Sequence, residues 1–489
     1  IRFQIVICYY RKMLNFFIII LKLILIKELI TPQKNFLCAS EKIRLKRSVA
    51  TGERSLLWND GIIPYKIDDS FSGLHRKFIR KVMQKWEKST CIQFVDRNDT
   101  IHQDYLALIH PDSRRCHTAI GKSYSGRNEL YLGKGCLNQR NILHELGHVI
   151  GFHHEHNRPD RDQYVNIKME NVKSGSEGNF EKLSPEEITT LNQKYDYNSI
   201  MHYRRYEFSS DQSKDTIVPL QIENNEIDEI GTLTELSDID IIATNLLYRC
   251  LECGKTLQDP EGTFGTAVDA NASPTSKKYC QWRISASHGE RIVLYITSLN
   301  IIESSPKCQT DYLQITDGYS TINPLLASIC GKHRIVDPII SSGNRMLITY
   351  RTDHFNEMYN GFTARYNKIC GGDIKIENEN QNYYLESPNY PSLYEDNKKC
   401  VWHLISPLNR KISIKFNYFK LEESLNCEND FVEIKNGDNS NLSSVGTYCG
   451  KNSPGEVISE GNKLIIKFVS DHEIQGNGFS AIITMVKSN

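Results

Sequence analysis

The residues with the clearest chemical potential form one histidine-rich stretch, HELGHVIGFHH, from His144 to His154. On a helix, His144 and His148 lie four residues apart on one face, so both imidazoles can reach one metal ion. Glu145 lies beside them, where a carboxylate can take a proton from water. Gly151 is expected to end the helix, because glycine adopts the left-handed conformation without a Cβ penalty, and the turn brings His154 back as a third ligand. Three histidines with an open position are typical of a catalytic zinc site.

The bare pattern HExxH is short, and an exposed helix with two surface histidines would match it by chance. The added glycine and third histidine make the full pattern far more specific. A second feature supports it, because the run SIMHY from Ser199 to Tyr203 has the form of the methionine turn that lies beneath the zinc in metzincins. We therefore expect Met201 to be a packing residue beneath the metal and not a ligand.

The sequence resembles one metzincin family, the astacins. The resemblance rests on SIMHY, on HELGHVIGFHHEHNRPDRD from His144 to Asp162, and on the runs WNDGIIPY from Trp58 and DTIVP from Asp215. It spans about Ser48 to Cys250. The resemblance implies a zinc-dependent endopeptidase with one Zn²⁺ on the three histidines named above, and Glu145 as the base that takes the proton of the attacking water.

Two further residues gain a role from this resemblance. In astacins, the tyrosine matching Tyr203 approaches zinc in the free enzyme and swings away to stabilise the tetrahedral intermediate. A phenol that donates to a developing oxyanion contributes about 10²–10³ in rate, although Tyr203 could also simply pack in the core. The mature amino terminus of astacins is commonly buried near the glutamate that matches Glu155, which is therefore an expected structural residue.

Composition indicates the class of protein. A chain of 489 residues is expected to contain about three domains. Lys plus Arg and Asp plus Glu both number 59, so there is no basic excess to favour a nucleic acid partner. Fourteen cysteines indicate an oxidising compartment, so we expect a secreted, extracellular protein.

Residues 1–47 are expected to be a leader with a signal and a pro-segment. The run from Leu14 to Ile30 is strongly apolar and follows two basic residues, as in a signal peptide. A type II membrane anchor is the alternative, but Lys22 and Lys27 inside the run disfavour it, so no stable membrane span is expected in the mature form.

The basic run RLKR from Arg44 to Arg47 has the spacing that furin-like processing enzymes read, although a plain basic linker would look the same. Because the astacin-like region begins directly after it, we predict a zymogen that is cleaved to give Ser48 as the mature amino terminus. Its ammonium group is then expected to interact with Glu155, directly or through water.

The periodicity of the astacin-like region predicts its elements. Alternation predicts strands around Ile62–Ile67, Tyr105–His110 and Glu129–Leu132, and the third is expected at the sheet edge beside the cleft, where it could pair with an extended peptide. The spacing of apolar residues predicts a helix over Leu74–Lys88. Its buried stripe is expected to contain three side chains, Phe78, Val82 and Trp86.

Beyond Cys250 the sequence contains an internal repeat. Residues 253–366 and 370–484 carry the same landmarks in the same order, and short alternating runs in both predict all-β sandwiches. Both repeats resemble CUB domains. The expected fold is therefore multidomain: an α+β metzincin (astacin-like) catalytic domain over 48–250, followed by two all-β CUB sandwiches.

The two resemblances imply six disulfides, although sequence alone leaves three connectivities open for the four cysteines of the catalytic domain. The implied pairs are Cys91–Cys250, Cys116–Cys136, Cys253–Cys280, Cys308–Cys330, Cys370–Cys400 and Cys427–Cys449.

Many CUB domains bind calcium through one glutamate and two aspartates at one end of the sandwich. Three converging carboxylates repel one another without a cation, and their hard oxygens suit Ca²⁺, whereas isolated loop acids are simply solvated. The matching residues are Glu303, Asp311 and Asp353 in the first repeat and Glu422, Asp430 and Asp471 in the second.

Astacin domains followed by CUB domains are similar to the tolloid and procollagen-processing proteases. The resemblance implies extracellular protein substrates, such as matrix or growth-factor-regulating proteins, held by CUB domains that bind protein. Members of this group that prefer an acidic residue after the cut often have a basic residue in the loop that matches Gly231–Leu236. This loop has none, so the resemblance does not imply an aspartate preference. A catalytically weak adhesion or ligand-binding protein is the second function class. Possible N-glycosylation sites lie at Asn98, Asn271 and Asn441.

Overall fold

The computed structural model describes residues 47–111, 115–220, 229–251, 253–266, 278–303, 308–332, 335–353, 361–437 and 443–487. The expected leader before Arg47 and the possible glycosylation sites at Asn271 and Asn441 lie outside the described residues. Asn98 lies within them and is half-buried. In the described part of the chain, we find no helix that is long and apolar enough to cross a membrane.

The astacin-like domain is built on one five-stranded sheet in the order β3-β2-β4-β6-β5. The first four of these strands run parallel, and β5 is antiparallel to β6. Because β5 pairs along β6, the prediction that Glu129–Leu132 is the sheet edge is wrong. The edge is instead the short β5. The strands are β2 (Ile62–Ile67), β3 (Gln93–Asp96), β4 (Tyr105–Ile109), β5 (Cys116–Thr118) and β6 (Arg127–Leu132).

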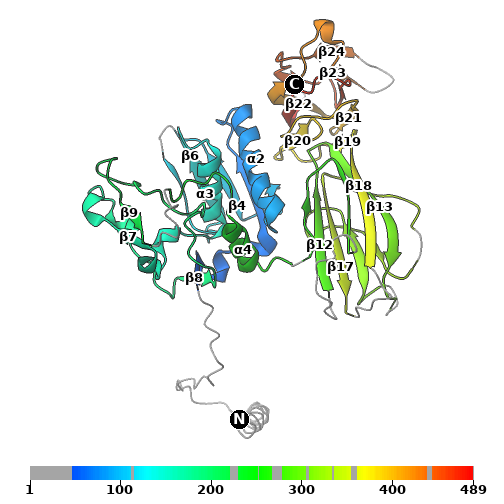
Figure 1. Cartoon of the computed structure of the whole chain (residues 1–489). Coiled ribbons are helices and arrows are strands. Elements are labelled where there is room, and N and C mark those ends of the chain that lie inside the picture. The colour runs from blue at the N-terminus through cyan, green and yellow to red at the C-terminus, as the bar shows by residue number, and fades with distance from the viewer. Residues whose placement is uncertain are drawn as a thin grey trace, which may run out of the picture. The chain divides into compact units, whose positions relative to one another are not determined.

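In the described part of this domain, the sheet is accompanied by the helices α2 (Gly73–Ser89), α3 (Gln139–Ile150) and α4 (Asp238–Leu247) (Figure 1). The predicted helix over Leu74–Lys88 is confirmed as α2, one residue longer at each end. Its buried face contains Val82 and Trp86, as expected, but also residues that the spacing of four did not include. Phe78 is only partly buried, while Ile79 and Met83 are almost completely buried.

A smaller part of the astacin-like domain lies C-terminal to α3 and has its own apolar core around Phe180 and Tyr195. The described part of the whole astacin-like domain also contains two small antiparallel sheets and several 3₁₀ turns. The paired strands are β1 (Arg47–Thr51) with β8 (Ile188–Leu191) and β7 (Val165–Ile167) with β9 (Ile217–Pro219). The 3₁₀ turns of this domain are Arg54–Leu56, Asn59–Gly61, Glu155–Asn157, Arg161–Gln163, Met169–Asn171 and Glu177–Phe180.

Each repeat is a sandwich of two sheets, with five and four strands, and the strand order is the same in both. The equivalent residues Trp282 and Trp402 are fully buried in the two cores, so the repeated landmark is a core residue. The first repeat has β10 (Thr256–Leu257), β11 (Glu261–Gly265), β12 (Lys278–Ser285), β13 (Glu290–Asn300), β14 (Tyr312–Thr316), β15 (Leu325–Ile329), β16 (Ile339–Ile340), β17 (Arg345–Thr352) and β18 (Gly361–Cys370).

The second repeat confirms the prediction of an all-β sandwich in the same way. Its sheets are β19-β21-β26-β23-β24 and β20-β27-β22-β25. It has β19 (Gly372–Lys375), β20 (Tyr383–Glu386), β21 (Lys399–Ile405), β22 (Arg410–Lys420), β23 (Phe431–Asn436), β24 (Ser443–Tyr448), β25 (Glu456–Ile458), β26 (Lys463–Val469), β27 (Gly478–Lys487) and one 3₁₀ turn (Leu425–Cys427).

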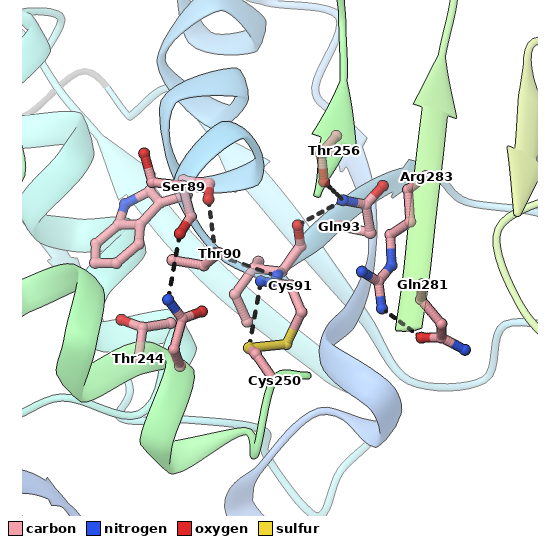
Figure 2. Close-up of a disulfide and its surroundings, with 12 residues drawn as sticks. Ser89, Thr90, Cys91, Gln93, Thr244, Cys250, Thr256, Gln281 and Arg283 are labelled. Atoms are coloured by element: carbon pink, nitrogen blue, oxygen red, sulfur yellow. Dashed lines mark hydrogen bonds between the residues drawn. A yellow bond between two sulfur atoms is a disulfide. The ribbon is translucent and has the colours of Figure 1, made fainter. Parts of the chain in front are cut away.

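The six disulfides of the structure are the pairs that the resemblances imply. Cys91–Cys250 joins the end of α2 to the segment that follows α4, so it closes most of the astacin-like domain into one loop (Figure 2). None of these twelve cysteines can act as a thiol nucleophile.

Candidate metal centre

Helix α3 carries the first two histidines and begins and ends where its sequence requires. The Asn138 side chain caps the helix by accepting from the Asn141 N–H at 3.0 Å. Gly151 follows the last helical residue with a φ of 120°, a conformation that glycine adopts without strain. Between these ends, His144 and His148 lie one turn apart, with their ring centroids 4.7 Å apart.

Backbone carbonyls fix the orientation of both rings. The Nδ1 atom of His144 lies 2.8 Å from the Ile200 carbonyl oxygen, and that of His148 lies 2.7 Å from the Phe152 carbonyl oxygen. Since a carbonyl oxygen only accepts, each Nδ1 carries the proton and each Nε2 keeps its lone pair. This is the tautomer that a metal-ligating histidine needs.

The turn at Gly151 brings His154 to the same point, as the sequence predicted, while the neighbouring His153 is not part of the group. One ligand atom from each of His144, His148 and His154 lies within 4.8 Å of the others. The Nε2 atoms of His148 and His154 are 3.1 Å apart. Burial lowers the pKa of all three imidazoles, that of His148 to about 4. Neutral nitrogen donors gathered this closely fit a zinc ion.

Glu145 lies beside this group and is 6% exposed. Its Oε2 atom is buried without a hydrogen-bond partner among the described residues. Burial raises the pKa of this carboxyl from 4.5 to about 8. A buried carboxylate oxygen with no hydrogen-bond partner among the described residues is suited to bind a water molecule or to accept a proton from one.

Tyr203 lies over the histidines in a cage of aromatic rings. Its ring centroid is 4.3 Å from that of His154 and 4.1 Å from that of His156. The rings of Phe180 and Phe208 complete the cage at 6.1 Å and 5.6 Å. Burial raises the pKa of the Tyr203 phenol, with smaller effects from the charges of two nearby glutamates, one of which is Glu145. The phenol therefore keeps its proton at neutral pH.

Met201 is 2% exposed and forms the floor under α3, as expected. Its turn is held by a buried carboxylate, because Asp240 accepts from the Ile200 N–H at 2.9 Å and from the Ser199 hydroxyl at 2.7 Å. Asp240 lies in the first turn of α4, so this helix positions the methionine turn.

Comparisons with known proteins agree with this geometry. Residues 50–249 match the family model described as Astacin, a peptidase family, and residues 253–366 and 370–482 match the CUB domain. The Bone morphogenetic protein 1 homolog of Strongylocentrotus purpuratus is 38% identical over 443 residues, which cover 90% of this chain and 68% of that protein. The chain belongs to the astacin family.

Two other relatives extend the comparison. The Dorsal-ventral patterning protein tolloid of Drosophila melanogaster is 37% identical over 468 residues, which are 91% of this chain but only 43% of that protein. The chain thus spans less than half the length of this relative. The solved structure of High choriolytic enzyme 1, a hatching enzyme zinc-protease from Oryzias latipes, is 34% identical, covers 44% of this chain and 100% of its own, and has a TM-score of 0.36.

Glu155 directly follows the third histidine of the astacin domain and is 7% exposed. Its Oε1 accepts from Arg158 Nη1 at 2.8 Å and from the Asp196 N–H at 3.0 Å. Burial raises the pKa of this carboxyl to about 7. The expected cleavage position before Ser48 lies within β1, and the expected interaction of the Ser48 ammonium with Glu155 stays a prediction.

One further residue beside the metal centre was not predicted from the sequence. His156 is completely buried, packs on Tyr203, and donates through Nε2 to the Asn179 carbonyl at 3.0 Å. The spacing pattern that selects the three ligands ends at His154, so it gave no indication that His156 packs against Tyr203.

The two CUB repeats differ at their candidate calcium residues. In the second repeat, Glu422, Asp430 and Asp471 have ligand atoms within 4.8 Å of one another. Asp430 is 1% exposed, and burial raises the pKa of its carboxyl against the opposing effect of hydrogen bonds from the Tyr394 hydroxyl and the Asp471 N–H. Glu422 Oε2 is buried and has no hydrogen-bond partner in the described part of the chain. Three acids held this way fit a divalent cation.

Among the described residues, the matching trio of the first repeat does not form such a group. Asp311 is buried and accepts from the Thr352 hydroxyl and the Asp353 N–H. The Asp353 carboxylate instead pairs with Arg351 at 3.0 Å, and Glu303 is exposed. In the first repeat, Arg351 thus provides the positive charge that a bound cation would supply to the three acids of the second repeat.

Proposed function

We propose that this chain is a zinc-dependent endopeptidase that hydrolyses peptide bonds of protein substrates. One observation carries the proposal: three neutral imidazoles converge on one point, with the unpartnered carboxylate oxygen of Glu145 beside it. A core that merely satisfied its histidines would not gather three ring nitrogens at one point and, on the residue next to His144, leave a buried carboxylate oxygen with no hydrogen-bond partner among the described residues.

Each residue then has a defined task. His144, His148 and His154 would hold the ion through Nε2, and it would supply Lewis acidity toward the scissile carbonyl and toward water. Glu145 takes the proton of the attacking water and later returns it to the leaving amine nitrogen. Its raised pKa suits a group that both accepts and donates a proton near neutrality.

Tyr203 serves as a donor to the oxygen that becomes negative as the carbonyl is attacked. Its raised pKa keeps the phenol protonated, which this role requires. The proximity of its ring to His154 supports a position from which a modest side-chain rotation reaches the substrate oxygen.

The CUB repeats are proposed to bind protein, so that substrates are held near the astacin domain. The second repeat is proposed to bind one Ca²⁺ through Glu422, Asp430 and Asp471, which would order the loops that carry these acids. The disulfides support secretion, and extracellular substrates such as matrix or growth-factor-regulating proteins are part of the proposal.

Activation is proposed to follow cleavage between Arg47 and Ser48. A small cavity of about 20 Å³ beneath the methionine turn has three acidic residues in its lining, Glu155, Asp196 and Asp240, together with Arg158 and Lys194. This space suits a water molecule next to an ammonium group, and the acids suit its charge. Mass-spectrometric sequencing of the active protein should start at Ser48.

The test is cleavage of casein by the processed protein and by its Glu145→Gln variant. The wild type should cleave, and the variant, which keeps the histidines and nearly the same volume, should lose at least about 10³-fold in rate. Equal cleavage by both would remove Glu145 from the mechanism, and no cleavage by either would favour a pure binding protein.

A further inference from the structure

A second cluster of ionisable groups lies away from the zinc site, where elements of the astacin domain and both CUB repeats meet. Residues Leu45–Asn489 form one compact unit. Arg80 on α2 and Asp96 on β3 come from the astacin domain, His288 from the turn before β13, and Glu386 from β20. The side chain of Glu386 is only 3% exposed, and that of Arg80 is 13% exposed.

His288 connects all three parts. Its Nε2 lies 2.8 Å from Asp96 Oδ2, and its Nδ1 lies 2.9 Å from Glu386 Oε2. A neutral imidazole has one N–H, whereas both nitrogens here face carboxylate oxygens, so this geometry requires the doubly protonated ring. Arg80 pairs with Glu386 and lies 3.4 Å from Asp96 Oδ1. Two cations and two anions thus balance in a site largely shielded from water.

The close approach of backbone segments at two glycines supports the same contact between the domains, and this evidence does not depend on charge. Gly73 begins α2 with no positive φ that would require glycine, yet a Cβ on it would lie 1.7 Å from the carbonyl oxygen of Asn417 in the second repeat. Between the repeats, a Cβ on Gly289 would lie 2.9 Å from Trp402 Nε1, which donates to the Gly289 carbonyl at 2.7 Å. Gly73 is thus explained by the close approach of two domains, whereas Gly289 combines a close approach between the repeats with a φ of 92° that itself favours glycine.

Neighbouring contacts extend this surface along α2. Lys77 donates to the Asn477 side chain at 2.6 Å and lies over the rings of Tyr418 and Tyr390 in the second repeat. On the side of the first repeat, the Gln93 amide donates to the Thr256 hydroxyl at 3.2 Å (Figure 2).

We propose that Arg80, Asp96, His288 and Glu386 form an ionic latch that holds both CUB repeats on helix α2, and that the latch releases when His288 loses its proton. The partner of this astacin surface is therefore the chain's own CUB pair. Release would free the repeats to move relative to the zinc site without unfolding any of the three domains.

The direction of the pH effect follows from the groups around His288. Burial alone would lower its pKa, but the carboxylates of Asp96 and Glu386 raise the pKa of His288 from 6.5 to about 9. The raised pKa means that latch stability is complete below about pH 6.5 and is lost as pH rises through about 9. Burial also lowers the pKa of Lys77 to about 8, so its loss of charge acts in the same direction. Arg345 and Glu87, 3.8 Å apart nearby, balance each other.

Two backbone amides report the contact between the repeats that the latch residues His288 and Glu386 make. The Glu386 N–H donates to the His288 carbonyl at 2.9 Å, and the His288 N–H donates to Glu386 Oε2 at 3.2 Å, so both bonds cross between the repeats. Hydrogen exchange of these amides should be slow in the full chain and at least about tenfold faster in Asp96→Asn. The control Glu379→Gln, which removes an exposed pair with Arg410 in the second repeat, should leave exchange unchanged.

Small-angle scattering on the same proteins measures the domain arrangement. The radius of gyration of the wild type at pH 7 should be smaller than that of Gly73→Leu, a steric variant that keeps every charge, and it should increase between pH 7 and pH 10. Far-UV circular dichroism separates release from unfolding. The latch would be overturned if the amide exchange rates of Asp96→Asn and the radius of gyration of Gly73→Leu both equalled those of the wild type. A wild-type radius of gyration that does not change with pH would overturn release by deprotonation of His288.

Discussion

Gly147, one turn before the end of helix α3, lies directly against Met201. A Cβ on Gly147 would lie 2.4 Å from the Met201 sulfur and 3.4 Å from its terminal methyl carbon. The helix that carries two histidines and the turn that supports them are therefore packed without space for a methyl group. Because the Ile200 carbonyl also accepts from His144, a shift of this turn moves a ligand.

Gly147→Ala tests this packing. The added methyl group must displace the buried Met201 side chain, and overpacking of this kind costs about 1–3 kcal/mol. We expect a thermal midpoint several degrees lower and weaker zinc binding, measured by competition with a chromophoric chelator. As a control, Gly178→Ala adds a methyl group at a place with nothing within 4 Å and should change neither quantity. Equal effects of both changes would contradict the proposed contact.

Tyr203→Phe tests the role of the phenol. The ring remains in its cage of His154, His156, Phe180 and Phe208, so folding and zinc content should not change. Loss of the donor to the developing oxyanion should lower kcat by about 10²-fold and leave KM within a few-fold. A purely structural tyrosine would show a shift in thermal stability without this separation of kcat from KM.

The two CUB repeats should differ in calcium affinity. Asp430→Asn in the second repeat should abolish one calorimetric Ca²⁺ binding event of the full chain, because it removes a charge from three converging acids. The matched change Asp311→Asn in the first repeat should leave that event intact, since Arg351 already neutralises Asp353. The reverse result would show that the arrangement of acids does not determine the site.

The disulfide Cys91–Cys250 closes a loop with a sequence separation of 159, compared with 20 for Cys116–Cys136. The chain-entropy account predicts that losing the first destabilises by about 5 kcal/mol and losing the second by about 3 kcal/mol. Paired Cys→Ala variants in denaturant titrations measure this difference. A larger loss for the short loop would indicate that strain or packing, and not loop closure, dominates.

The sequence was most informative where spacing determines chemistry. His144, His148, Gly151 and His154 are a local pattern, and local backbone geometry was enough to bring the three rings together. The repeated landmarks likewise indicated two sandwiches, and the disulfide pairs followed from the two family resemblances and not from the cysteine spacing alone. The turn that Gly151 allows was also enough to predict that His154, and not its neighbour His153, joins the other two histidines.

Relationships between distant segments could not be predicted. The place of Glu129–Leu132 inside the sheet depends on three residues at Cys116–Thr118 that pair with it, and such a short strand has no clear periodicity. The difference between the calcium residues of the two repeats depends on the side-chain partner of Asp353. The contact of Gly73 with Asn417 joins residues far apart in the sequence, and only the folded chain brings them together.

The most direct test of the metal centre is the zinc content and activity of the processed protein. Plasma mass spectrometry should find one zinc per chain. Removal by a chelator such as phenanthroline should abolish cleavage of casein, and one equivalent of zinc should restore it. His148→Ala should neither retain zinc nor cleave. Cleavage that persists after complete metal removal, or a wild-type protein that binds no zinc at all, would contradict the proposal that these three histidines form a catalytic metal site.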